Sequence, residues 1–516
     1  MKKVLLPLAA MLLGAGAAQA GANVYASALK AENGKITFVL NDAADKVVLN
    51  VIKDGAVIAT ADLGAGVKGV NSVNVPSVAV EAGQYEWSLT ASGAAHADVI
   101  QVTDGTDANL QLSSGRGIAV DMFPSSPAFG NVYAVSPATP RNEGARTACG
   151  LYAFDAALTP LNADPYTGGI TWEEGNSNPN NLTVAENGQV FICSWGDAQG
   201  GVYVADPADL GAAWAPAFAD GERDASGLVT IGGTAVHGSV QDVAVYGTGD
   251  ARMMYTSDED MHGTNGDIMV YNIGTLASPW DKAPTADWGH PEGYVNGNHR
   301  LESDQRGGLW LGQYRWNESA ANACVYHLNK DGQLDFQTGD KSVFLGSYPA
   351  GTIAANADGS LLACVGLADG TGFVVAKATY TAEGVPSLEK LCEYSYSGYG
   401  NRPMAAAFDA ANNLYIMFNN ADSEGGIGVF AIPTEKNEFT TPASAKIALG
   451  GAGVESVAAD AAGYTFEDGI IAAEAGVAVY TAAGVKVAEG ASVDTKALAA
   501  GVYVVRAGGA AFKIAK

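Results

Sequence analysis

The chain has 516 residues, which exceeds the usual length of one domain, so we expect several domains or one repeat array with attachments. Its formal net charge is −27, from 55 acidic and 28 basic residues, and this charge excludes nucleic acid and anionic membrane surfaces as expected partners because most of the surface would repel them. The five cysteines are far apart and form no Cys-x-x-Cys pair, which favours buried thiols over a disulfide framework or a metal cluster.

Residues 1–20, "MKKVLLPLAAMLLGAGAAQA", have the pattern of a secretory signal peptide. A basic start at Lys2 and Lys3 precedes an apolar run and an Ala-Gln-Ala end at residues 18–20. The apolar run is too short to cross a membrane, and no cysteine stands at the cleavage point for a lipid anchor. We therefore expect a secreted or outer-surface protein without a transmembrane span.

Short runs rich in Val, Ile, Tyr and Phe recur between Gly, Asn and Asp turns, with almost no helical periodicity, so the chain is predicted to be all-β. In residues 21–110, strands are expected at 36–40, 47–52, 57–63 and 85–91, which suits an antiparallel sandwich. The order "VVLNVIKDGAVIATADLG" followed by "EAGQYEWSLTASG" resembles the Ig-like modules of flagellar hook-capping proteins and many exported bacterial proteins. This resemblance implies a fold and no chemistry.

A strand-turn-strand phrase repeats through residues 111–450. Its copies are "GIAVDMFPSSPAFGNVYAV", "NLTVAENGQVFICSW", "VQDVAVYGTGDARMMYTS", "HRLESDQRGGLWLGQ", "TIAANADGSLLACVG" and "PMAAAFDAANNLYIMF". A third strand follows each copy, and "GLVTIGG", "KSVFLGS" and "KIALGG" are expected as fourth strands. Four strands in each period of roughly 50 to 60 residues predict a six-bladed β-propeller. A stack of sandwiches is the alternative, but each period has too few strands to close one.

The tail, residues 451–516, is predicted to form a small β-sandwich. The phrases at residues 477–487, 498–505 and 512–516 resemble the C-terminal sorting domain of the Bacteroidota type IX secretion system. This resemblance implies a secreted or surface protein whose tail is recognised by the secretion machinery. The alternative is a terminal sandwich that only packs on the propeller.

Strand order assigns the loops of a propeller to its two faces. If the strands of a blade run A to D outward, the D–A and B–C loops share one face, which we call the loop face, and the A–B and C–D turns share the other. The A–B turns are short and rich in Asp, Asn and Gly, whereas the D–A loops, such as "DWGHPEGYVNGNH", carry aromatic residues, histidines and arginines. Loops on a rigid scaffold commonly carry function.

Aromatic rings with Arg, Asn and Asp partners suit sugar rings, so an extracellular glycan or polymer is the expected ligand. The alternative is that these aromatic residues only pack the loops against one another. The expected ligand-binding residues are Trp172, His237, Trp288, His290, Tyr294, His299, Arg315, Trp316, Tyr348, Tyr396, Tyr399 and Arg402.

No metal or other cofactor is expected from the histidines, because His237, His290 and His299 form no local ligand pair. Calcium stays an alternative in "SDEDMHGTNGD", residues 257–267, where aspartates offer hard oxygen ligands, although His262 and Met269 break the EF-hand pattern.

The sequence favours a binding protein over an enzyme. No Gly-x-Ser-x-Gly elbow is present, and carboxylates are too abundant to nominate an acid/base pair. The carboxylates considered are Glu173, Glu174, Asp242, Asp258, Glu292 and Glu302. The alternative is a propeller hydrolase, lyase or lactonase with a metal near the central channel.

Overall fold

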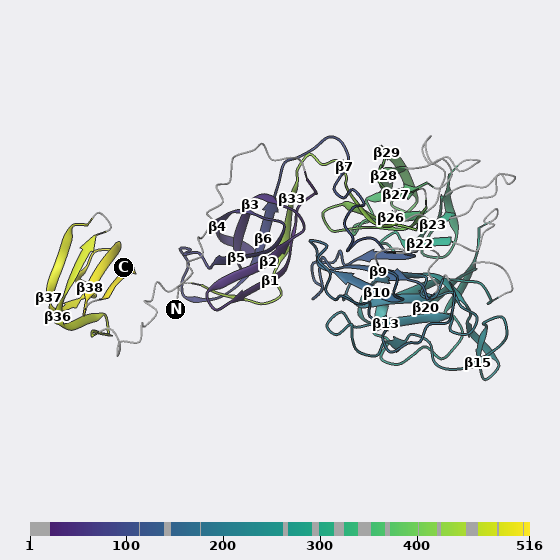
Figure 1. Ribbon diagram of the computed structural model, residues 1–516, viewed down its shortest axis with the longest axis horizontal. Helices are drawn as coiled ribbons and strands as arrows, with labels where there is room; N and C mark the ends of the chain where they lie inside the picture. Colours follow the sequence, from purple (N-terminus) through teal and green to yellow (C-terminus); the bar gives the residue numbers. More distant parts are fainter. Residues whose placement is uncertain are drawn as a thin grey trace, which may run out of the picture.

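The computed structural model shows an all-β protein, as predicted (Figure 1). It describes residues 21–112, 114–138, 146–175, 177–261, 267–291, 299–313, 325–338, 352–366, 372–400, 402–419, 425–449, 463–481, 484–508 and 510–515. Over these ranges the only helical elements are two short 3₁₀ turns, η1 (Gly249–Ala251) and η3 (Thr495–Ala497). Within the same ranges, no helix is long and apolar enough to cross a membrane.

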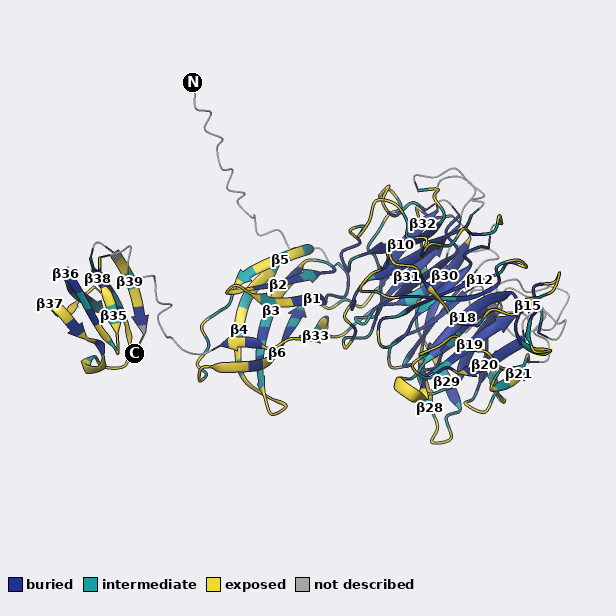
Figure 2. Cartoon of the chain, turned by 90° about the horizontal axis from the view of Figure 1, so that it is seen from below, coloured by how far each residue is buried: buried dark blue, intermediate teal, exposed yellow. Residues whose placement is uncertain are grey.

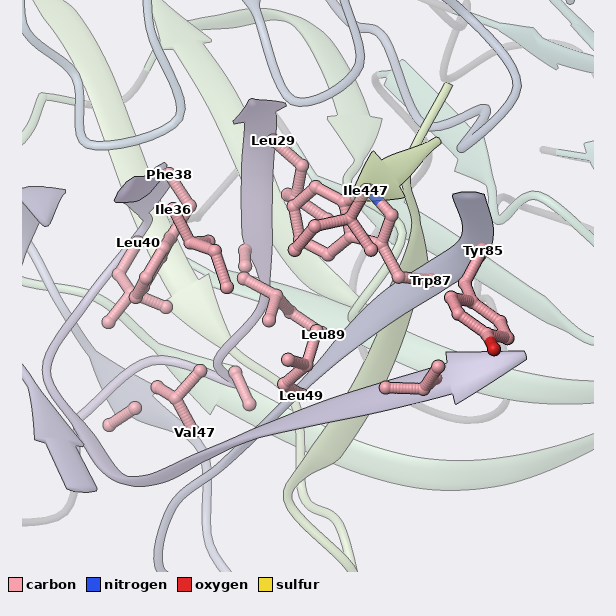
Figure 3. Packing of buried hydrophobic residues seen from close by; sticks show 14 of the residues in the cluster. Leu29, Ile36, Phe38, Leu40, Val47, Leu49, Tyr85, Trp87, Leu89 and Ile447 are labelled. Carbon is pink, nitrogen blue, oxygen red and sulfur yellow. The ribbon is translucent and has the colours of Figure 1, made fainter. Parts of the chain in front are cut away.

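The N-terminal module is the predicted antiparallel sandwich. Its first six strands are β1 (Ala26–Glu32), β2 (Lys35–Leu40), β3 (Ala44–Lys53), β4 (Ala56–Gly66), β5 (Gly69–Asn74) and β6 (Gly83–Ser92). One sheet has the order β1-β2-β5, and β6, β3 and β4 belong to the other. Alternate apolar residues of both sheets, including Phe38, Leu49 and Trp87, bury a common core (Figure 3).

Two strands that follow the propeller in the sequence complete this sandwich. β33 (Glu438–Pro442) and β34 (Ile447–Leu449) both pair with β6. Ile447 packs beside Trp87, whose indole nitrogen donates to the carbonyl oxygen of Ala445 at 2.8 Å (Figure 3). The phrase "KIALGG" is therefore not the fourth strand of a sixth blade, because its apolar side chains are buried in the sandwich. The sandwich also extends beyond the predicted range of 21–110.

The central module is a six-bladed propeller, and each of the six repeated phrases supplies the first two strands of a blade. The first blade contains β8 (Gly117–Val120), β9 (Val132–Ser136) and β10 (Gly150–Phe154), and the second contains β11 (Asn181–Val184), β12 (Val190–Ser194), β13 (Gly201–Ala205) and β14 (Ala215–Pro216). The third blade contains β18 (Val240–Tyr246), β19 (Met253–Asp258), β20 (Asp267–Asn272) and β21 (Ala286–Gly289), and the fourth contains β22 (His299–Ser303), β23 (Leu309–Gln313), β24 (Val325–Leu328) and β25 (Leu334–Gln337). The fifth blade contains β26 (Thr352–Ala355), β27 (Leu361–Val365), β28 (Gly372–Tyr380) and β29 (Pro386–Ser395), and the sixth contains β30 (Pro403–Phe408), β31 (Asn413–Phe418), β32 (Gly426–Ala431) and β7 (Ile100–Gln101). The innermost strands contact one another in the order β8, β11, β18, β22, β26, β30 and back to β8, so the ring is closed.

The fourth strand of the last blade comes from the other end of the propeller sequence. β7 precedes the first blade and pairs with β32, with Gln101 opposite Phe430. Val102 continues this pairing, since its N–H donates to the carbonyl oxygen of Val429 at 2.8 Å. The ring is thus closed by hydrogen bonds between two distant parts of the chain.

Two other expected fourth strands differ from the structure. "GLVTIGG" contributes β16 (Val229–Ile231) to a separate three-stranded sheet with β15 (Glu222–Arg223) and β17 (Thr234–His237). The fourth strand of the second blade is instead the two-residue β14, which lies in an alanine-rich stretch without strand periodicity. "KSVFLGS", residues 341–347, lies outside the described residues, and β25 is the fourth strand of the fourth blade.

The sandwich contacts the A–B turns of the first and last blades. The ring of Tyr25 lies 5.5 Å from that of Phe129, in the β8–β9 turn, and 6.2 Å from that of Phe439. The turns are held as predicted by polar side chains: Asp409 accepts from the N–H groups of Ala411 and Asn413 at 3.0 and 2.8 Å. The sandwich therefore covers part of the face opposite the loop face.

The C-terminal module is a separate sheet with its own core. Its strands are β35 (Thr465–Glu467), β36 (Ile470–Thr481), β37 (Lys486–Asp494), β38 (Val502–Ala507) and β39 (Ala510–Ala515). The long β36 pairs with β35, β37 and β38, and β38 pairs with β39. Figure 2 shows buried residues along β36 and exposed residues on β37, as expected for one covered and one solvated face.

Candidate functional site

Several predicted ligand-binding residues cannot be placed. Tyr294, Arg315, Trp316 and Tyr348 lie outside the described residues, and for His299 only the backbone is described. The His299 backbone begins β22, the innermost strand of the fourth blade, as the repeat predicted.

Trp172, Tyr396 and Tyr399 lie in the core, although they were expected to bind ligand. Tyr399 stacks on Phe418 with ring centroids 4.6 Å apart, and its hydroxyl donates to Thr103 Oγ1 at 2.7 Å. Tyr396 packs on the same Phe418, while Trp172 belongs to a buried cluster of the first two blades. These aromatic residues pack within the propeller. Such packing was the alternative interpretation of the aromatic residues in the loops.

Trp288 and His290 have different surroundings from each other. The Trp288 ring lies 5.3 Å from that of Tyr255 and rests against Gly332, where a Cβ atom would come within 2.4 Å of the indole. Its position assigns it to packing between the third and fourth blades. His290 is exposed, with Nδ1 at 2.6 Å from Asp267 Oδ1. Arg402, just before β30, is exposed.

His237 lines a pocket on the loop face, and Tyr399 lines another, beside β7. His237 ends β17, directly before the innermost strand of the third blade, and its ring stacks on Phe218 at 4.2 Å with an interplanar angle of 17°. Its Nδ1 lies 3.0 Å from the carbonyl oxygen of Gly238. Gly201 faces the ring with a φ of +136°, and a Cβ atom there would come within 3.1 Å of His237 Cε1. Glycine therefore leaves room for the imidazole.

The three-stranded sheet β15–β17 forms the outer wall of this pocket, and Arg223 anchors it. The guanidinium of Arg223 donates to the carbonyl oxygen of Gly227 within the sheet at 2.7 Å. It also donates to the carbonyl oxygen of Gly200, in the B–C loop of the second blade, at 2.7 Å. These bonds fix the inserted sheet to the blade, because charged donors make strong hydrogen bonds in partly buried sites.

The pocket, which we call the His237 pocket, has a volume of about 320 Å³. Its lining includes Gln199, Tyr203, Phe218, Asp220, Arg223 and His237. The volume lies at the lower end of the range for small-molecule sites, and the mixture of rings and polar groups is typical of them. Burial lowers the pKa of His237 from 6.5 to about 4, so the imidazole is neutral at neutral pH.

Two aspartates of residues 257–267, where calcium was the alternative, accept hydrogen bonds from backbone N–H groups next to His237. Asp258 accepts from the N–H of Gly238 at 2.7 Å, and Asp260 accepts from the N–H of Ser239 at 2.8 Å. Burial raises the pKa of Asp258 to about 7. Asp267 lies beside His290. Over the described part of the chain, no group of three potential metal-ligating side chains occurs.

The central channel is a second polar site, with a volume of only about 40 Å³. Asp242 accepts from Asn181 Nδ2 at 2.6 Å and from the N–H of Leu301 at 2.9 Å, and Arg300 Nη1 lies 3.9 Å from it. Glu302 also lines the channel, and burial raises its pKa well above the ordinary value. This space suits a few water molecules and is too small for an organic substrate.

Four lining residues of the pocket were not predicted: Tyr203, Phe218, Asp220 and Arg223. Tyr203 was assigned to a blade strand, and the other three lie in a segment that had no assigned role. A signal was available: residues 207–240, between the third strand of one copy and the start of the next, are longer than a fourth strand and a loop require.

No family model matches the sequence, and no curated protein matches it. Solved structures that resemble the chain include a protein of unknown function from Bacteroides thetaiotaomicron, with 13% identity, 79% of this chain and 98% of that chain covered, and a TM-score of 0.38. A periplasmic gluconolactonase of Pseudomonas aeruginosa has 15% identity, covers 79% and 100%, and has a TM-score of 0.35. The WD40 repeats of RRP9 have 10% identity, cover 66% and 98%, and have a TM-score of 0.40.

Proposed function

We propose that the chain is an exported propeller protein that binds an extracellular glycan through the loop face, at the His237 pocket. The observation that carries this proposal is the pocket itself, a cavity of about 320 Å³ between the second blade and the anchored sheet β15–β17. Its walls are fixed by the blade and by the two Arg223 bonds, so a ligand would meet a preformed site.

A sugar unit suits this lining. Tyr203 and Phe218 supply apolar ring surface, and Asp220 and His237 supply polar atoms beside it. Sugars combine a face of C–H groups with hydroxyls around the rim, so aromatic and polar groups together match them. The rings of Tyr203 and Trp172 pack in a T shape with centroids 5.4 Å apart, which holds Tyr203 in place. Trp172 thereby supports the pocket without lining it.

Export is part of the same proposal and is supported by the sequence. Residues 1–20 have the signal-peptide pattern, and the tail resembles a type IX sorting domain. The expected location is the outer cell surface or the medium, and the expected second partner is the secretion machinery. Fusing residues 1–20 to a reporter enzyme tests the signal: the reporter should leave the cytoplasm, and its retention there would contradict export.

Glycan binding is tested with an array of oligosaccharides followed by calorimetric titration. The variant Tyr203→Ala should lose at least tenfold in affinity, because it removes ring surface from the pocket. Tyr246→Ala is the matched control, since Tyr246 is also half-buried but lies at the A–B turn of the third blade, on the opposite face. Equal binding by the wild type and Tyr203→Ala, or no binding to any glycan, would overturn the proposal.

The competing function is a hydrolase, lyase or lactonase with a metal near the channel. The observation that favours it is the proximity of Asp242 and Glu302 to one channel, with the pKa of both raised by burial. Elemental analysis and lactone hydrolysis assays of the wild type and Glu302→Gln test it. Stoichiometric metal together with turnover lost in Glu302→Gln would favour this function over glycan binding alone.

A further inference from the structure

We propose that the His237 pocket selects uncharged, hydroxyl-rich sugars and rejects uronic acids and sulfated sugars. This inference rests on the proposed glycan-binding function and names the chemical class of its ligand. The inference rests on two observations: which donors and acceptors of the pocket already bond to other protein atoms, and which have no such bond.

The open atoms of the pocket are acceptors. The Nδ1 of His237 lies 3.0 Å from the carbonyl oxygen of Gly238, and no described residue bonds to the other ring nitrogen, Nε2. Asp220 is exposed, and its carboxylate accepts no hydrogen bond from the described residues. A ligand must therefore donate hydrogen bonds to these two side chains.

The donors of the pocket are mostly used within the protein. Arg223 donates to three carbonyl oxygens, those of Gly200, Gly227 and Asp197. Gln199 donates through its side-chain amide to Thr171, and the Tyr203 hydroxyl donates to the carbonyl oxygen of Gln199 at 3.3 Å. A carboxylate or sulfate group needs several donors to replace its hydration, and most donors of the pocket are already bonded to protein carbonyl oxygens.

The charges around the pocket oppose an anion as well. Arg223 is the cation in the lining, and the carboxylates that interact with it include Asp260 and Glu173, in addition to Asp220 in the lining itself. One guanidinium among several carboxylates leaves a negative local charge. A neutral sugar meets no repulsion, whereas an acidic sugar does.

The state of His237 fits the same ligand. The neutral ring with its proton on Nδ1 donates to Gly238 and leaves a lone pair on Nε2. A sugar hydroxyl can donate to that lone pair and to the Asp220 carboxylate. A ligand carboxylate cannot, because it has no proton to donate at neutral pH.

The test uses matched pairs of oligosaccharides built from galactose and galacturonic acid, from glucose and glucuronic acid, and from N-acetylglucosamine and its 6-sulfate. Calorimetric titration should give at least tenfold tighter binding to the neutral member of a pair that binds. The variant Asp220→Lys replaces an acceptor by a cationic donor, so it should reduce or reverse that preference. Asp209→Lys makes the same charge change at an exposed site on the opposite face of the same blade and should leave it unchanged.

The outcomes separate this inference from the proposed function. Equal or tighter binding of the acidic member, with binding still lost in Tyr203→Ala, would overturn the selectivity and leave glycan binding in place. An unchanged preference in Asp220→Lys would also overturn it. Binding of neither member of any pair would overturn the proposed function and the selectivity together.

Discussion

Asn23 of the sandwich and Asn413 of the sixth blade bond to each other in both directions. The N–H of Asn23 donates to Asn413 Oδ1 at 2.8 Å, and Asn413 Nδ2 donates to the carbonyl oxygen of Asn23 at 2.8 Å. Both residues are buried, and Asn23 Nδ2 also donates to the carbonyl oxygen of Ile432 at 3.0 Å. The contact between the two modules is therefore specified by directional bonds as well as by the apolar packing around Tyr25.

We expect Asn413→Ala to lower the free energy of unfolding by about 1 to 3 kcal/mol, because it leaves buried groups of Asn23 without partners. Denaturant titration measures the change. Asn162→Ala, at an exposed turn, is the control and should change stability by less than about 0.5 kcal/mol. Equal stabilities of the two variants would contradict the structural role of the pair.

Tyr399→Phe separates packing from ligand binding. The substitution keeps the ring that stacks on Phe418 but removes the hydroxyl that bonds to Thr103, so stability should fall by about 1 kcal/mol. Glycan affinity should be unchanged, because Tyr399 does not line the His237 pocket. A loss of affinity at unchanged stability would instead assign Tyr399 to a binding surface.

His327 lies buried between two carboxylates, with Nδ1 at 2.6 Å from Asp335 Oδ1 and Nε2 at 3.1 Å from Asp304 Oδ2. His327→Leu leaves both carboxylates without this partner, so we expect the free energy of unfolding to fall by about 3 to 5 kcal/mol, as measured by thermal or denaturant unfolding. Asp335→Asn should cost less, because the amide oxygen can still accept from the ring. A smaller loss in His327→Leu than in Asp335→Asn would refute this arrangement.

Acid should destabilise the protein through His237. Its pKa is about 4 in the folded state and about 6.5 in an unfolded chain, so the unfolded state binds the proton first as pH falls. Stability is then lost progressively from about pH 6.5 down to about pH 4, by up to about 3 kcal/mol. Asp258, with its pKa raised to about 7, acts in the opposite sense, since its stabilising neutral form is lost as pH rises from about 4 to 7.

The variant His237→Gln isolates the first of these effects. Denaturant titrations at several pH values between 4 and 7 measure the free energy of unfolding of the wild type and the variant. The difference between the two free energies should shrink as pH falls. A constant difference across this range would contradict a buried neutral imidazole.

The blades were predictable because each strand-turn-strand phrase is a local pattern. The residues of β11, β12 and β13, for example, alternate with turns rich in Asn and Gly, and the pairing is between neighbours in the sequence. The outermost strands were not predictable in the same way. β7 and β14 have two residues each, and such short strands at the edge of a blade carry too few side chains for a periodic signal.

The pocket was predictable only in part. His237 was expected on the loop face because the repeat places the residues before β18 there. Tyr203 was not expected, because a strand residue can face either a neighbouring blade or a loop, and the sequence does not distinguish the two. The burial of Tyr396 and Tyr399 depends on Phe418, which lies in the next strand pair, and on the β7 segment far earlier in the chain.

The pairing of β33 and β34 with β6 sets an order for folding. Ile447 and Leu449 are core residues of a module whose other strands are synthesised before the first blade. The first module to be made is therefore the last that can close, and it stays short of two strands until every blade has been synthesised. A chain that stalls or is cut within the propeller leaves β6 with unpaired N–H and C=O groups, which are a template for association with other chains.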